Sequence, residues 1–269
     1  MHENHLTCNH FSADGEIKWG IDFLSETGKH KLYYELAWIY DKYYKRKFDY
    51  KNFYDVLAPH LEENKVTNIL DVACGAGHLL QILEEHGYRC TGIDLSDDML
   101  SHAHKRVKCK LLRQDMRGLK LRERFDAVTC LGSAFTYMRT HRDVVNALRC
   151  FYRCIKDGGI LIFDCFDAEG FKIERFDRWR EETQLFDDMS ITCKTMSTDW
   201  RAEDSSWDVH WVWVVEDASG VREFSDVARL RAHRYDYLAM VLSDIGFRGI
   251  KRLESKRLTV LAHKYARTN

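Results

Sequence analysis

Proline is almost absent from this 269-residue chain, in which it occurs once, at Pro59. An excess of charge is lacking too, because 41 basic and 42 acidic residues give a formal net charge of −1. Such a balance produces no global field that would attract nucleic acid or an anionic membrane. The longest apolar runs are far shorter than the roughly 20 residues that span a bilayer. The first residues also lack the apolar segment of a signal peptide, so we expect neither secretion nor membrane insertion.

A disulfide pattern is also missing. The nine cysteines are an odd number and follow no framework spacing, which indicates reduced thiols in a bacterial or archaeal cytoplasm. Four side chains near the start are of zinc-binding type, but their spacing matches no standard zinc finger, and we predict no metal site there. These residues are His2, His5, Cys8 and His10.

The apolar fraction of 45% is ample for a core. Residues from about 29 to 61 look helical and are rich in tyrosine, and strand and helix patterns then alternate to about residue 167. Helices are expected at about 77–86, 97–106 and 141–156. The expected strands are Asn68–Val72, Arg89–Asp94, Lys110–Arg113, Phe125–Leu131 and Ile160–Asp164. This alternation predicts a parallel, doubly wound sheet with right-handed crossovers.

The pattern changes after this region. Three or four strand-like segments between about residues 189 and 233 predict an antiparallel meander, whose tryptophans form its core or roof a pocket. A helix at Tyr235–Ile245 and two strands, Phe247–Leu253 and Leu258–Lys264, follow. A hairpin between these strands would complete seven strands and give an antiparallel strand at the sheet edge. The predicted fold is α/β, Rossmann-like and mostly parallel, with an N-terminal helical segment and an antiparallel β insertion.

The clearest binding signal lies between residues 68 and 99. A buried strand ends in a glycine-containing turn, Asp71-Val-Ala-Cys-Gly-Ala-Gly77, and after a helix the next strand ends at Asp94. Glycines let the backbone approach a ligand closely, and the N-terminus of the following helix directs N–H groups toward it. A carboxylate at the end of the second strand is placed to accept hydrogen bonds from two ribose hydroxyls. This arrangement predicts a site for an adenosine-containing cofactor.

Three acidic residues decide which cofactor is expected. A dinucleotide-binding motif has a third small residue where this chain has Leu80. Asp71 would crowd a pyrophosphate, but it can orient the loop and interact with an ammonium group. Asp115, after the third strand, can accept the exocyclic amine of adenine, with apolar side chains around the ring: Leu95, Met99 and Met116. Amine, ribose and adenine without phosphate are parts of S-adenosylmethionine, and a dehydrogenase is the less favoured alternative.

Four segments, DVACGAG, GIDLSDDML, RQDMRGL and FDAVTCLGSAFTYM, resemble motifs of class I S-adenosylmethionine-dependent methyltransferases. The resemblance covers about residues 33–265. It is nearest to small-molecule N-methyltransferases, notably those that dimethylate amino sugars on nucleotide carriers, and to glycine N-methyltransferase. Two departures are Ala73 in place of the first motif glycine and Asp157 in place of a turn proline. The cofactor-binding residues that the resemblance implies are Asp71, Ala73, Gly75, Gly77, Asp94, Leu95, Met99, Asp115, Met116 and Leu131.

The acceptor site is predicted from tyrosines. Because methyl transfer is an in-line displacement at an activated sulfonium, alignment of donor and acceptor can replace a strong base. The resemblance places Tyr44 and Tyr137 near the methyl acceptor, and we predict both as catalytic. The related enzymes have a histidine at the position of Tyr137, and a phenol is a poor base at neutral pH, which favours catalysis by orientation. The predicted substrate-binding residues are Tyr40, Tyr44, Tyr137 and Arg234, for which core packing or solvated charge are the alternatives.

The leading function is methylation of a small molecule at an amine nitrogen, with oxygen or carbon as alternatives. Methylation of RNA or protein is disfavoured by the balanced charge but kept open by the basic stretches Arg175–Arg180 and Lys251–Arg257. A non-catalytic regulator is a third class. The sequence does not fix the oligomeric state, and a homodimer is compatible with it. The expected division is a flexible tail (1–28), a helical cap (29–64), a cofactor-binding core (65–170), an insertion or lid (171–234) and a C-terminal part that completes the core (235–269).

Overall fold

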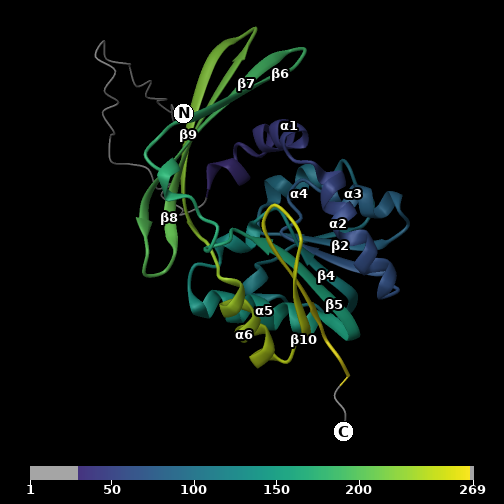
Figure 1. Cartoon of the computed structure of the whole chain (residues 1–269). Coiled ribbons are helices and arrows are strands. Elements are labelled where there is room, and N and C mark those ends of the chain that lie inside the picture. Colours follow the sequence, from purple (N-terminus) through teal and green to yellow (C-terminus); the bar gives the residue numbers. More distant parts are fainter. Residues whose placement is uncertain (1–29, 267–269) are drawn as a thin grey trace, which may run out of the picture.

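The computed structural model describes residues 30–266, and a seven-stranded sheet lies at its centre (Figure 1). Its order is β10-β11-β5-β4-β1-β2-β3. The strands are β1 (Asn68–Val72), β2 (Arg89–Asp94), β3 (Lys110–Arg113), β4 (Phe125–Cys130), β5 (Ile155–Cys165), β10 (Arg248–Leu253) and β11 (Leu258–His263). β1 to β5 pair in parallel, whereas β11 runs antiparallel to both β5 and β10. The predicted mostly parallel sheet is confirmed, and its antiparallel strand lies second from the edge.

Helices cover both faces of this sheet (Figure 1). On one side lie α2 (Tyr50–Glu63), α3 (His78–Glu85) and α4 (Asp97–His104), and on the other lie α5 (His141–Cys154) and α6 (Tyr235–Ile245). Successive side chains of a strand point to opposite faces, so Ile69 packs with α2 and α3, whereas Leu70 packs with α5 and α6. A capping box of Thr140 and Asp143 begins α5.

A second, four-stranded sheet stands beside the core at the top of Figure 1. Its strands are β6 (Arg180–Leu185), β7 (Met189–Arg201), β8 (Ser206–Asp217) and β9 (Gly220–Arg231). All pairs are antiparallel. β7, β8 and β9 correspond to the predicted meander. β6 was not predicted, because its sequence REETQL has no alternating apolar face from which a strand could be recognised.

The N-terminal segment connects the two sheets. It contains η1 (Lys31–Tyr33) and α1 (Ala37–Lys47) ahead of α2. The helical pattern expected over residues 29–61 is interrupted after α1, where the side chain of Asp49 accepts a hydrogen bond from the amide of Asn52 and caps α2. α1 packs on the second sheet, with Tyr43 and Trp213 both fully buried and in edge-to-face contact at 5.1 Å between ring centroids. Three further short helices are η2 (Met116–Gly118), η3 (Ala134–Tyr137) and η4 (Ile173–Arg175).

The expectations about membrane spans, cysteines and metal sites can be compared with the structure only for residues 30–266. Within residues 30–266, no helix combines the length and apolar character needed to cross a bilayer. The eight cysteines of this range are free thiols. Over the same range, no group of three or more His, Cys, Asp or Glu side chains is arranged to hold a metal ion. The N-terminal histidines and Cys8, which the sequence raised as zinc-type ligands, lie outside the described residues.

Candidate functional site

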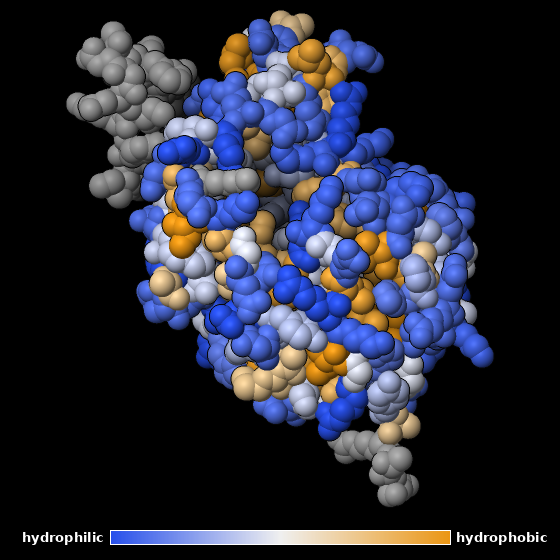
Figure 2. All heavy atoms as spheres, in the orientation of Figure 1, coloured by the Kyte–Doolittle hydropathy of each residue, from blue (hydrophilic) through white to orange (hydrophobic). Residues whose placement is uncertain are grey.

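A cavity of about 870 Å³ lies between the carboxyl ends of the core strands and the second sheet. The space-filling view shows the surface hollowed where the two parts meet (Figure 2). Its walls combine the cofactor loop, the ends of β2 and β4, tyrosines of the N-terminal segment and aromatic residues of the second sheet. In an open α/β sheet, ligands bind in the crevice at the carboxyl ends of the strands, which is the position of this cavity.

The glycine-containing turn after β1 has an unusual backbone. Ala73, Gly75 and Gly77 all have positive φ angles, of 57°, 54° and 80°. Left-handed backbone is costly for a residue with a Cβ atom, so Ala73 adopts it at a cost that a glycine would avoid. Ala73 and Gly75 line the cavity. Gly77 instead lies against α4, where an added Cβ atom would be 3.0 Å from the Cβ atom of Ala103.

Asp94 ties this turn to the next strand. One carboxylate oxygen accepts a hydrogen bond from the amide of Gly75 at 2.8 Å, and the other accepts one from the amide of Ser96 at 2.9 Å. Burial raises the pKa of Asp94, and these two backbone hydrogen bonds oppose that rise. The carboxylate lines the cavity and, with its remaining lone pairs, can accept further hydrogen bonds from a ligand.

Asp71 lies beneath the turn and is not among the cavity-lining residues. It is 3% exposed and accepts a hydrogen bond from the Thr129 hydroxyl of β4 at 2.7 Å. Burial raises its pKa to about 7; the Thr129 hydrogen bond lowers this pKa and the charge of Asp94 raises it. The structure thus places Asp71, like Gly77, where it shapes the turn from below.

The other residues predicted to bind the cofactor line the same cavity: Leu95, Met99, Asp115, Met116 and Leu131. Asp115 accepts hydrogen bonds from the amide of Arg117 at 2.9 Å and from its guanidinium, with Nη2 at 2.6 Å. The hydrogen bond from the Arg117 side chain lowers the pKa of Asp115. This part of the cavity is therefore a mostly apolar slot with a carboxylate at its rim.

The predicted tyrosines come together in the wall of the same cavity, where Tyr40 packs against Met99. Tyr40 and Tyr44 of α1 have their rings tilted by 34° with 4.5 Å between centroids, and both line the cavity with Tyr137 of η3. Burial raises the pKa of Tyr44 and of Tyr137, so both phenols stay protonated at neutral pH. Tyr33 was not among the predicted site residues, yet its hydroxyl is hydrogen-bonded to that of Tyr137 at 2.8 Å.

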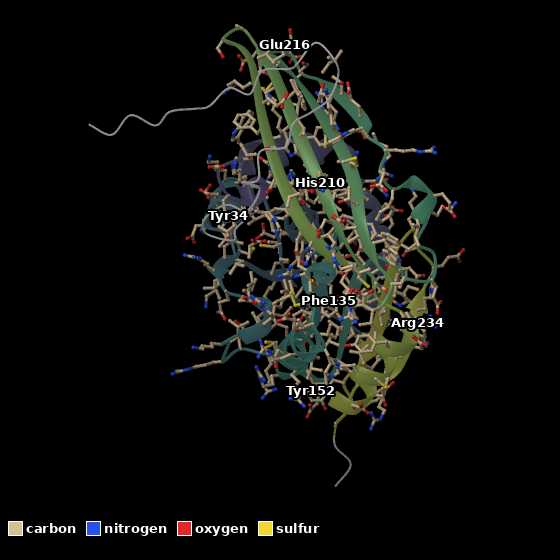
Figure 3. All side chains as sticks on the ribbon, turned by 90° about the vertical axis from the view of Figure 1, so that its left-hand side faces the viewer. Tyr34, Phe135, Tyr152, His210, Glu216 and Arg234 are labelled. Carbon is tan, nitrogen blue, oxygen red and sulfur yellow. The ribbon has the colours of Figure 1, made fainter. Side chains whose placement is uncertain are left out.

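Arg234 is not brought to this cavity. Figure 3 shows it at the margin of the molecule, where its side chain is 57% exposed and pairs with Glu169 at 3.1 Å and Asp236 at 3.2 Å. Arg117, which pairs with Asp115 at 2.6 Å, lines the cavity, and so do four other cations: Lys172, Arg180, Lys256 and Arg257. Two of the four lie in the basic stretch before β11 and one opens β6, so their meeting depends on tertiary structure that local patterns do not reveal. Trp207 and Trp211 of the second sheet also line the cavity.

A carboxylate on α1 fastens this helix to the cofactor turn. Asp41 accepts hydrogen bonds from His78 of α3 at 2.7 Å, His102 of α4 at 3.1 Å and Arg106 at 3.0 Å. Arg106 also donates to the carbonyl of Ala76 within the turn. Burial acts to raise the pKa of Asp41, but the His78 hydrogen bond and the nearby positive groups hold it at about 2.

Comparisons with known proteins agree with this geometry. A sequence model described as a methyltransferase domain matches residues 69–159. The dTDP-3-amino-3,4,6-trideoxy-alpha-D-glucopyranose N,N-dimethyltransferase of Streptomyces venezuelae is 30% identical over 178 residues, which are 65% of this chain and 73% of that protein. A glycine/sarcosine N-methyltransferase of Parasynechococcus marenigrum (strain WH8102) is 38% identical over 112 residues, 39% of each chain. Some curated relatives are thus matched over only 39% to 44% of their length.

Solved structures are similar over most of the chain. The crystal structure of Streptomyces venezuelae DesVI has a TM-score of 0.76 at 26% identity, covering 85% of this chain and 98% of that one. The sugar N-methyltransferase KedS8 from Streptoalloteichus has a TM-score of 0.76 at 21% identity, covering 96% of this chain and 100% of that one, and shows the shared fold.

The fold and the turn define a doubly wound α/β protein that binds a nucleoside-containing ligand at its strand ends. The chain belongs to the class I S-adenosylmethionine-dependent methyltransferases. The predicted class of enzyme and the predicted cofactor are thereby confirmed. The residues present fit this cofactor, because the slot offers a carboxylate at Asp94 and apolar walls, and none of the turn residues 71–77 is a cation that a phosphate would need.

Proposed function

We propose that this methyltransferase acts on an amine nitrogen of a small molecule that also carries an anionic group. The observation that carries the proposal is the composition of the cavity at the strand ends. One side is the cofactor slot, and the other combines protonated tyrosines with four cations and aromatic side chains. An amine can be oriented by phenols, and an anionic substituent can be bound by guanidinium and ammonium groups.

For the cofactor, we assign the ribose hydroxyls to Asp94 and the adenine to the slot around Asp115. The apolar side chains of this slot are Leu95, Met99, Met116 and Leu131. The methionine part would lie along Ala73 and Gly75, whose backbone approaches the cavity, while Asp71 and Gly77 hold the turn in shape. When bound, S-adenosylmethionine supplies a methyl group already activated by the positive charge of its sulfonium.

The protein's own contribution is then to align the acceptor and to exclude water. Positioning of this kind can lower a barrier by about 7–11 kcal/mol. Tyr44 and Tyr137 suit that role, because a protonated phenol can donate a hydrogen bond or accept one from an N–H group. Their raised pKa values make them unsuitable as proton acceptors at neutral pH. We assign them, with Tyr40, to acceptor orientation, and we propose residues 171–234 as the lid.

Relatives support this choice of acceptor. The Streptomyces venezuelae and cyanobacterial proteins are named for N-methylation of an amino sugar on a nucleotide carrier and of glycine or sarcosine. The cations of the present chain lie within the cavity wall, which supports a small anionic acceptor over the flat basic surface expected for RNA. A cytoplasmic location and a homodimer stay predictions.

Incubation of the enzyme with methyl-labelled S-adenosylmethionine and matched pairs of amines and alcohols tests the proposal. We expect label in the amines, and more of it in those that carry a carboxylate or phosphate. Transfer only to the alcohols, or to RNA, would contradict it. Arg180→Met should raise KM for anionic amines about tenfold, as a charge-assisted hydrogen bond contributes about 1.5–3 kcal/mol. Arg178→Met, two residues away and outside the cavity lining, is the matched control.

A further inference from the structure

A histidine lies in the cavity wall beside the predicted acceptor tyrosine. His30 lines the cavity, and its ring centroid is 5.4 Å from that of Tyr137 and 6.2 Å from that of Tyr33. Among the described lining residues, it supplies the imidazole. His30 was not predicted as a site residue, because nothing in the local pattern around residue 30 indicates that it reaches the strand ends.

A buried carboxylate of the second sheet faces this histidine. The Nδ1 atom of His30 lies 4.0 Å from a carboxylate oxygen of Asp226 on β9. Asp226 is 8% exposed and is fixed by two amides, with Leu32 donating at 3.0 Å and Val227 at 2.9 Å. Its position is therefore set by the backbone on both sides, and the histidine is held between this carboxylate and the tyrosines.

The charged and titratable groups that surround His30 decide its protonation. Burial lowers its pKa, the charge of Asp226 and a hydrogen bond to the backbone of Val227 raise it, and Arg139 lowers it. The net effect is a pKa below the usual 6.5, so the imidazole is neutral at pH 7. The other faces of the ring meet Tyr33 and Tyr137, which are protonated and uncharged at this pH.

Methylation of an amine creates a proton that must leave. When the nitrogen lone pair forms the new C–N bond, the carbon–sulfur bond of the donor breaks and its electron pair stays on sulfur. The nitrogen becomes positively charged and must lose a proton before its lone pair can attack a second time. The tyrosines cannot take this proton, and the carboxylates Asp94 and Asp115 lie at the cofactor end of the cavity.

We propose that His30 accepts the proton released by the methylated nitrogen, and that Asp226 stabilises the imidazolium that forms. The inference rests on the proposed amine acceptor. Because Nδ1 faces Asp226, Nε2 is the atom that receives the proton. His30 would thus contribute most to a second methylation, which starts from an amine that has to be deprotonated inside the cavity.

The test follows the transfer of the second methyl group against pH, in a single turnover that starts from the monomethylated amine. With excess S-adenosylmethionine, it also follows the ratio of mono- to dimethylated product. In the wild type, the rate should fall as the pH drops through the pKa of His30. His30→Gln should lose this limb, slow the step by about 100-fold and accumulate the monomethylated product. Asp226→Asn should move the limb to lower pH, because the carboxylate raises the pKa of His30. His104→Gln, outside the cavity lining, is the matched control.

Unchanged affinity of His30→Gln for S-adenosylhomocysteine would show that the variant is folded. If this variant does not fold, His30→Asn is measured in its place. A variant with the wild-type pH profile and product ratio would overturn the role of His30 and leave the amine acceptor in place. A wild type that methylates no amine would overturn both proposals. The two failures are therefore distinguishable.

Discussion

The contacts of Asp41 with His78, His102 and Arg106 predict how firmly α1 is attached to the cofactor turn. The pKa of this carboxyl is about 2, against an ordinary value of 3.8, and each pKa unit corresponds to about 1.4 kcal/mol. The ionised side chain, 19% exposed, thus contributes about 2.5 kcal/mol to folding at neutral pH. Asp41→Asn should lower the free energy of unfolding by about 2 kcal/mol and Tm by about 4–8 °C.

The pH dependence of this loss gives the sharper measurement. The folded-state pKa is depressed, so the contribution is complete well above pH 3.8 and falls as the pH approaches 2. By pH 3 about half of it remains. Urea unfolding of wild type and Asp41→Asn at pH 7, 4 and 3 should show the difference between them shrinking in that order.

Asp188→Asn is the matched control, because it removes an ion pair with Lys42, which lies on α1 next to Asp41. Asp188 is 63% exposed, and surface pairs of this kind contribute little, so no measurable change is expected. The reasoning would be refuted if Asp41→Asn were as stable as the wild type at pH 7, or if its deficit were the same at pH 3.

Three further predictions concern the cofactor turn. Asp94→Asn should weaken S-adenosylhomocysteine binding about 100-fold by calorimetry, because the two hydrogen bonds from the ribose hydroxyls lose their charged acceptor. An unchanged Kd would exclude Asp94 as the ribose ligand. Gly77→Ala should destabilise more than Gly87→Ala in thermal unfolding. Both glycines have left-handed backbone, with φ of 80° and 86°, but of the two only Gly77 would bring an added Cβ atom within 4 Å of a neighbour. Equal losses would mean that the contact with Ala103 is unimportant. Thr129→Val removes a hydrogen bond that favours ionised Asp71. The folded-state pKa of Asp71, about 7, is already above its unfolded value, so ionisation opposes folding as the pH rises, and Thr129→Val should cost more at pH 8 than at pH 5 in urea unfolding. Equal costs would contradict this.

Local patterns were sufficient for the core sheet and the cofactor turn. The strand Asn68–Val72, the turn that follows it and the acidic end of Arg89–Asp94 lie close together in sequence, and their periodicity and glycines specify them directly. Helix Tyr235–Ile245 was likewise predicted with the bounds observed, because Gly246 adopts left-handed backbone, with φ of 118°, at its end.

The acceptor side could not be predicted in the same way. Tyr33, His30 and the lining cations reach the cavity through long-range packing of η1, β6 and the hairpin between β10 and β11. The edge strand β6 is polar except for its last residue, Leu185, so neither its existence nor the position of Arg180 is encoded in a hydrophobic period. Arg234 shows the converse. Its place at the end of a strand predicted substrate binding, but its side chain pairs with Glu169 and Asp236 at the surface.

Helix α1 has attachments on both sides. Tyr43 and the Lys42–Asp188 pair join it to the second sheet, and two residues away from Tyr43, Asp41 joins it to the helices that flank the cofactor turn. The second sheet therefore cannot shift relative to the cofactor turn without either moving α1 with it or breaking one set of contacts. Any coupling that α1 transmits between the two halves of the cavity must be reciprocal: an acceptor that tightens donor binding is itself bound more tightly, by the same factor, when the donor is present.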